Sequence, residues 1–112
     1  MATQFNPCVV IGVRDKHASA ADFCEVLGGE LTDSADDWVE VTAGPFKFYF
    51  VEDGTSDVAF SVDVEDEAEL LPKLLSRGFV VDAAITERIG ETFVRSRDGV
   101  LINLYAVKPG AG

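Results

Sequence analysis

The chain repeats one pattern of predicted elements, and this repeat constrains the fold more than any single motif. Each half of the 112-residue sequence reads as a strand, a helix, a short strand and a hairpin. The first copy covers about residues 8–51 and the second about residues 58–107, with the polar stretch 52–57 as a linker. Because neither half can bury its own sheet face, we expect the copies to form one domain, residues 1–112: a curved sheet with helices outside and a concave inner face.

A glycine turn marks the hairpin of each half. Asp98-Gly99 lies in the middle of the stretch 93–105, and Gly44-Pro45 separates the alternating stretches 38–42 and 46–51. Glycine accepts the positive φ that a tight hairpin turn requires. Both halves are therefore predicted to end in a β-hairpin.

The other elements follow from the spacing of apolar residues. We expect an irregular or edge-pairing arm over residues 1–7, a buried strand over 8–13, and a helix that is capped by Ser19 or a neighbour and stops at Gly28-Gly29. The second half is predicted to hold a strand at 58–64, a helix at 65–76, a short strand at 79–82 and a loop at 83–90.

Acidic side chains dominate the charge, with 20 Asp and Glu against 9 Lys and Arg and a formal net charge of −11. Such a charge repels phosphate backbones and anionic lipids, so we predict no nucleic-acid partner and no membrane partner. It either keeps a small protein soluble or selects cations. The uncharged stretch 2–13 is too polar at its start for a signal peptide and too short to span a bilayer, so we expect a cytoplasmic protein with Cys8 and Cys24 reduced.

Two motifs carry a family resemblance: VAFSVD at 58–63 and SRDGVLINL at 96–104. With the tandem repeat, they resemble the vicinal oxygen chelate superfamily, which includes glyoxalases, bleomycin-resistance proteins and extradiol dioxygenases. The resemblance covers about residues 8–107. It implies an α+β fold of two tandem β-α-β-β-β repeats around a concave inner cleft.

The enzymes of this family hold a divalent metal inside the concave sheet. Carried over residue by residue, the ligand positions fall on Cys8, Asp57 and Asn103, with the remaining one on or near Phe48. Asparagine offers only a neutral amide oxygen and phenylalanine offers nothing, so we expect the metal site to be lost and no cofactor to be bound. The single histidine, His17, is expected in a loop outside this set.

The remaining positions suggest a small-molecule cleft lined by aromatic and polar side chains. Phenylalanines at alternate positions of the stretch 46–51 form either core or an aromatic concavity, and Asp57 is either a carboxylate in the cleft or the exposed end of the linker. No catalytic and no metal-binding residue is predicted. The candidate ligand-binding residues are Cys8, Trp38, Phe46, Phe48, Phe50, Asp57, Arg95, Asn103 and Tyr105.

The leading functional hypothesis is a small-molecule-binding protein of the bleomycin-resistance type, without enzymatic activity, for a planar or cationic ligand that stacks on Trp38. The alternative is a metal-dependent lyase or isomerase of the glyoxalase type, or a dioxygenase-like enzyme, with non-standard ligands. A structural or regulatory domain without a small ligand is the third class. The resemblance also implies a homodimer with its cleft near the interface, Trp38 and Arg95 close to it, and repeats packed within one chain or exchanged between chains.

Overall fold

The computed structural model describes residues 3–52 and 57–108. The middle of the expected linker, residues 53–56, lies outside the described residues. The chain divides into two compact units, an N-terminal unit of residues 7–59 and a C-terminal unit of residues 1–6 with 60–112. Within the described residues, no helix is long and apolar enough to cross a membrane.

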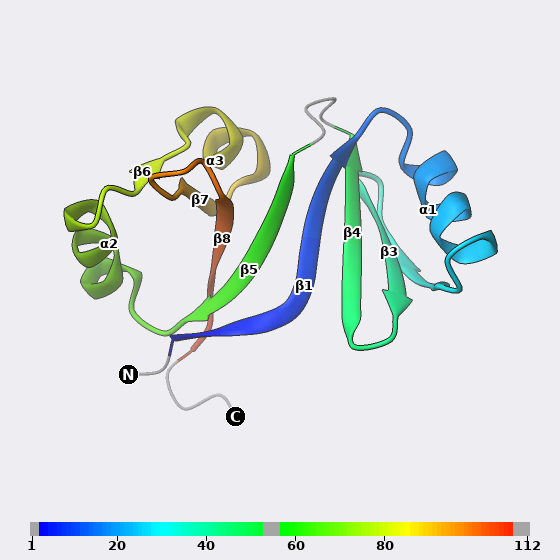
Figure 1. Cartoon of the computed structure of the whole chain (residues 1–112), viewed down its shortest axis with the longest axis horizontal. Coiled ribbons are helices and arrows are strands. Elements are labelled where there is room, and N and C mark those ends of the chain that lie inside the picture. Colours follow the sequence, from blue (N-terminus) through cyan, green and yellow to red (C-terminus); the bar gives the residue numbers. More distant parts are fainter. Residues whose placement is uncertain (1–2, 53–56, 109–112) are drawn as a thin grey trace. The chain divides into compact units, whose positions relative to one another are not determined.

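The N-terminal unit contains one complete β-α-β-β-β repeat (Figure 1). Its strands follow the order β2-β3-β4-β1, with β1 parallel to β4 and the other two neighbouring pairs antiparallel. The elements are β1 (Thr3–Val13), α1 (Lys16–Glu25), β2 (Glu30–Ser34), β3 (Trp38–Ala43) and β4 (Phe46–Glu52). The first predicted hairpin is confirmed, with Gly44 at φ 58° in its turn.

The core of this unit lies between α1 and one face of β3 and β4. Its buried members are Ala20, Val39, Val41 and Phe50. Phe23 of α1 meets the ring of Phe50 edge to face, with the ring centroids 4.8 Å apart. The apolar residues at alternate positions of β3 and β4 therefore pack against α1.

The start and end of α1 differ from the prediction. Asp15, and not Ser19, caps the helix, because its carboxylate accepts the amide N–H groups of His17 and Ala18 at 3.1 and 3.0 Å. His17 consequently lies in the first helical turn and not in a loop. The helix ends at Glu25, before the two glycines.

The C-terminal unit repeats the same arrangement with one additional helix. Its strand order is β5-β8-β7-β6, which corresponds element by element to β1-β4-β3-β2 of the other unit. The elements are β5 (Val58–Val64), α2 (Glu67–Ser76), β6 (Val80–Val81), α3 (Ala83–Ile89), β7 (Thr92–Arg95) and β8 (Leu101–Ala106). Leucines of α2 pack against buried Val62, Val64, Val94 and Leu104.

One prediction for this unit is wrong. Residues 83–90 form α3 and not a loop, because the Asp82 carboxylate accepts the Ile85 amide N–H at 3.1 Å and Gly90 ends the helix with φ 89°. Of the two alternatives for the N-terminal arm, the strand is the one observed from Thr3, the start of β1, and Asn6 bonds to side chains of β5. The α+β fold class with two β-α-β-β-β repeats is confirmed.

Candidate functional site

The sheet of the N-terminal unit has a second face, opposite α1. Neighbouring strand residues point to opposite faces, so the face that carries Val39 and Val41 toward α1 leaves Trp38 and Glu40 on the other side. Glu40 pairs in register with Tyr49 of β4. We call Trp38, Glu40 and Tyr49, with Thr32 of β2, the Glu40 cluster.

Hydrogen bonds and ring contacts hold the Glu40 cluster together. The Thr32 hydroxyl donates to Glu40 Oε1 at 2.7 Å, and the Tyr49 hydroxyl donates to Glu40 Oε2. Thr32 also shares a hydrogen bond of 2.9 Å with the Thr42 hydroxyl. The rings of Trp38 and Tyr49 meet edge to face, with centroids 5.4 Å apart and planes inclined by 77°. Three neighbouring strands therefore contribute to one ordered group of side chains.

The carboxyl and phenol groups of this cluster have opposite pKa shifts. Hydrogen bonds from Thr32 and then Tyr49 hold the pKa of Glu40 below its ordinary value, although its side chain is buried with only 8% of the residue exposed. Burial, followed by the hydrogen bond to Glu40, raises the pKa of Tyr49 far above its ordinary value. At neutral pH the site therefore holds a carboxylate anion beside a neutral phenol.

Sequence analysis missed Glu40, Tyr49 and Thr32 as site residues. Glu40 stands between two valines in the stretch 38–42, so strict alternation already separates it from the core face. The same alternation separates Tyr49 from the phenylalanines of β4. That signal was available in the sequence, but the register that joins these residues with Thr32 was not.

The predicted aromatic row lies mainly on the α1 side of the sheet. Phe50 is fully buried, and Phe48 is half-buried with its ring 5.3 Å from that of Phe23. Phe46 is 49% exposed at the start of β4. The structure therefore does not bring Trp38 together with this row on one face.

Two further predicted residues belong to the N-terminal unit. Cys8 is half-buried, and its side chain lies close enough to Tyr49 to hydrogen-bond with the phenol and add to its pKa increase. It therefore adjoins the Glu40 cluster. Asp57 is half-buried, and its backbone carbonyl accepts the Gly12 N–H at 2.8 Å.

In the C-terminal unit, Asn103 is the centre of a buried hydrogen-bond network. Its amide oxygen accepts the Ser61 hydroxyl at 3.1 Å, and its amide nitrogen donates to the Glu91 carboxylate at 3.0 Å. Asn6 continues the network by donating to Ser61 and Asp63 at 3.0 and 2.8 Å. Ser61 and Asn103 are each only 3% exposed. The amide thus links β8 to β5 and, through Ser61, to the start of β1.

The two remaining predicted residues lie on the same hairpin. Arg95 donates to the Asp82 carboxylate at 2.9 Å and to the Gly99 carbonyl at 3.3 Å. The Ile85 amide and the Arg95 guanidinium both lower the pKa of Asp82. Arg95 thereby ties the cap of α3 to the turn of the hairpin. Tyr105, near the end of β8, is 47% exposed.

Several residues at or beside the positions that the resemblance assigned to metal ligands make contacts within the protein instead. Phe48 packs toward α1, and its neighbour Tyr49 is a protonated donor to Glu40. The Asn103 oxygen already accepts a hydrogen bond. In residues 3–52 and 57–108, no three His, Cys, Asp or Glu side chains gather in a way that could hold a metal ion.

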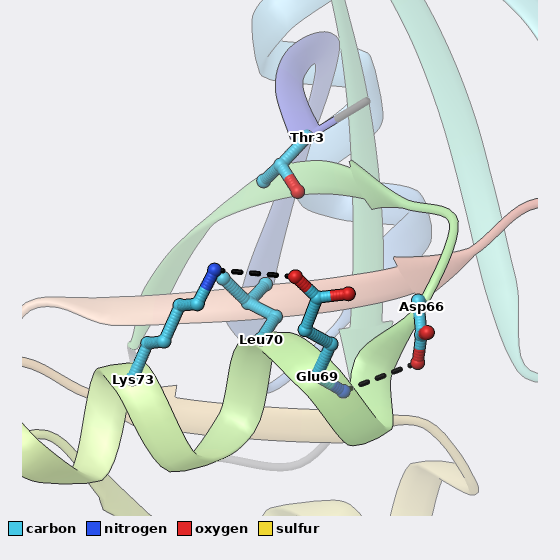
Figure 2. A pocket seen from close by; sticks show the side chains of 5 residues that line it. All are labelled: Thr3, Asp66, Glu69, Leu70 and Lys73. Atoms are coloured by element: carbon cyan, nitrogen blue, oxygen red, sulfur yellow. Dashed lines mark hydrogen bonds and ion pairs between the residues drawn. The ribbon is translucent and has the colours of Figure 1, made fainter. Parts of the chain in front are cut away.

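A small pocket of about 120 Å³ lies where the start of β1 faces α2 (Figure 2). It is lined by Thr3, Asp66, Glu69, Leu70 and Lys73. Lys73 pairs with Glu69 at 3.3 Å, and Asp66 caps the helix at the Glu69 amide. Figure 2 shows both contacts as dashed lines. The pocket is smaller than the roughly 300 Å³ at which ligand sites begin, and none of the predicted ligand-binding residues lines it.

Comparison with known proteins establishes the fold. A hypothetical protein from Bacillus halodurans C-125 matches with a TM-score of 0.69 at 13% identity, covering 100% of this chain and 99% of that one. A glyoxalase/bleomycin resistance protein/dioxygenase superfamily member from Vibrio splendidus 12B01 matches with a TM-score of 0.62 at 18% identity, covering 92% and 97%. The chain therefore has the vicinal oxygen chelate fold.

The fold alone does not define an activity. A structure described as an NAD-dependent benzaldehyde dehydrogenase from Legionella pneumophila also matches, with a TM-score of 0.64 at 9% identity, covering 90% of this chain and 98% of that one. No protein-family model and no curated protein matches the sequence. Function must therefore be inferred from the site residues.

Proposed function

We propose that the protein binds a small planar molecule on the face of the N-terminal unit opposite α1, without the metal of glyoxalase-type enzymes. The observation that carries this proposal is the Trp38–Tyr49 ring pair beside the Glu40 carboxylate. Aromatic rings that are ordered by neighbouring strands offer a surface for stacking, and a few placed polar groups orient the ligand.

The geometry of the ring pair suits stacking. Because the planes of Trp38 and Tyr49 are inclined by 77°, the two rings do not cover each other face to face. Trp38 is half-buried, so part of its surface remains exposed. A planar ligand can therefore add a second ring contact without displacing Tyr49 from its hydrogen bond.

The absence of the family metal is part of the same proposal. Its support is the chemistry of the residues that stand at the ligand positions. Asn103 uses its oxygen to accept a hydrogen bond from Ser61, and Tyr49 uses its hydroxyl as a donor, so both groups serve bonds within the protein. These residues do not fit the metal, and no catalytic step is assigned to it.

Binding can be measured by calorimetry with 9-(hydroxymethyl)anthracene, a planar neutral probe. We expect Trp38→Leu to weaken binding by about tenfold, corresponding to the loss of one aromatic contact of about 1.4 kcal/mol. Phe5→Leu is the matched control, because it removes another aromatic ring that is 68% exposed and lies on a different unit. Failure of the anthracene probe to bind, or equal weakening by both variants, would refute the proposed site.

We also propose a cytoplasmic homodimer. Cys8 and Cys24 form no disulfide bond in the described part of the chain, which is compatible with a reducing compartment. Large apolar side chains exposed on the C-terminal unit, including Phe60 at 47%, would be covered by a second copy. Light scattering should then give the mass of two chains, and Phe60→Ser should shift it toward one. A single-chain mass for the unmodified protein would rule out the dimer.

A further inference from the structure

We propose that Glu40 makes this site selective for planar aromatic cations, in which an ammonium or amidinium group lies beside the stacked ring. The inference rests on the proposed function, because it assumes that the ring of the ligand stacks on Trp38. It assigns the charge preference to one buried carboxylate and not to the net charge of the chain.

The first argument is that Glu40 forms no ion pair with any described residue, although Lys47 stands opposite Thr42 on the neighbouring strand. Its two printed donors, Thr32 and Tyr49, are neutral hydroxyls, and no ion pair involves Glu40 in the part of the chain that the structure describes. Lys47 influences it only through a weaker Coulomb attraction. The hydroxyl hydrogen bonds already favour the anion, and a ligand cation would add the direct ion pair that Glu40 lacks.

Other carboxylates of the chain show the contrast. Glu52 pairs with Lys16 at 3.1 Å, and Asp82 pairs with Arg95 at 2.9 Å. Their side chains are 42% and 17% exposed, whereas only 8% of residue Glu40 is exposed. Of these three carboxylates, Glu40 is the most buried and is the one that forms no ion pair within the described residues. Folding stability alone would favour the reverse arrangement.

The second argument is that Glu40 is held in place before any ligand arrives. Each carboxylate oxygen accepts one hydroxyl hydrogen bond, and Thr32 is itself bonded to Thr42. A carboxylate has about four acceptor positions, so capacity remains for the N–H group of a ligand. The faces of the Trp38 and Tyr49 rings attract positive charge as well.

Calorimetry with three anthracenes of one shape tests the charge preference: 9-(aminomethyl)anthracene, 9-(hydroxymethyl)anthracene and anthracene-9-carboxylate. In the unmodified protein we expect the aminomethyl probe to bind about tenfold more tightly than the hydroxymethyl probe, and the carboxylate probe more weakly than both. Glu40→Gln should abolish the tenfold preference of the aminomethyl probe over the hydroxymethyl probe.

Glu52→Gln is the matched control, because it removes the same formal charge from the same unit at a carboxylate that is already paired with Lys16. It should leave the preference intact. If Glu52→Gln lowers the preference as much as Glu40→Gln does, or if Glu40→Gln retains it, the assignment to Glu40 is wrong. If the unmodified protein binds the hydroxymethyl and aminomethyl probes with equal affinity, the inference about charge fails while the proposed function stands.

Thr42→Lys provides a second variant that keeps the Glu40 carboxylate. Thr42 lies two residues along β3 on the same face, so a lysine there can form the ion pair that Glu40 lacks. The tenfold preference should then disappear although the carboxylate is present. Persistence of the preference in Thr42→Lys would contradict the proposal even where Glu40→Gln is too unstable to measure.

Discussion

The two units share one topology but use the face opposite their first helix in different ways. In the N-terminal unit, Glu40 pairs in register with Tyr49 and carries a buried charge that only neutral hydroxyls contact. In the C-terminal unit, Phe93 pairs with Asn103, whose amide is bonded at both ends. Related places in the repeated fold therefore hold an ionised carboxylate in one unit and a neutral amide network in the other.

The comparison also separates charge from hydrogen bonding. The buried polar groups of the C-terminal unit, Ser61 and Asn103, are neutral and mutually bonded. Satisfied neutral groups stabilise a fold at little cost, whereas an ionised group that lacks a counter-ion keeps part of its desolvation penalty. At Glu40 the hydroxyl hydrogen bonds outweigh that penalty, since its pKa lies below the ordinary value.

The largest effect should come from the aromatic core of the N-terminal unit. Phe50→Ala is expected to lower the free energy of unfolding by about 3–5 kcal/mol, because the ring is fully buried against α1. Phe46→Ala, at the exposed start of the same strand, should cost about 1 kcal/mol or less. Urea unfolding followed by circular dichroism measures both. Comparable losses in the two variants would contradict the separation of core and exposed ends along β4.

The next effect concerns the Asn103 network. Asn103→Leu should lower the free energy of unfolding by about 1–3 kcal/mol, because the Ser61 hydroxyl loses its buried acceptor. Tyr105→Leu, two residues further along β8 and 47% exposed, should change it by no more than about 0.5 kcal/mol. Chemical denaturation of both variants measures these changes. If Asn103→Leu leaves the free energy of unfolding unchanged, the network does not stabilise this unit.

A smaller effect is expected from acid titration of Glu40. Its folded-state pKa lies below the unfolded value of about 4.3, so its ionisation favours the folded state above that pH. This contribution is lost as the pH falls through the lower folded-state pKa. Glu40→Gln should therefore lose less stability than the unmodified protein between pH 6 and pH 3. Thermal melts across this range test the sign, and identical pH profiles would show that the hydroxyl bonds do not favour the anion.

The smallest expected effect is that of metal removal. Dialysis against a chelator should leave both the thermal midpoint and the binding of the anthracene probes unchanged. The reason is that Asn103 and Tyr49 use their polar atoms in protein hydrogen bonds. Elemental analysis of protein purified without added metal provides the complementary measurement. Stoichiometric zinc, nickel or manganese would favour the enzymatic alternative over the binding proposal.

Local chemistry was sufficient to predict much of the fold. Alternation predicted the strands around Gly44, and the glycine itself predicted their turn, because both signals act between residues that are near in sequence. Helix ends were less predictable. Asp15 and Asp82 cap α1 and α3 through hydrogen bonds to amides two or three residues away. The chain has 20 Asp and Glu residues, so the sequence did not distinguish these two capping residues from the other acidic residues.

By itself, the sequence determined the order of the elements except α3, the two-fold repetition and the apolar period of each strand, because these depend on side chains within a few residues of one another. Only the tertiary structure decided which sheet face α1 covers, and with it that Phe50 is core while Glu40 and Tyr49 lie opposite. The two networks likewise join residues that are distant in sequence, nine positions apart for Tyr49 and Glu40 and 42 for Ser61 and Asn103. Strand register creates such contacts, and a one-residue shift would turn every side chain of the strand to the other face.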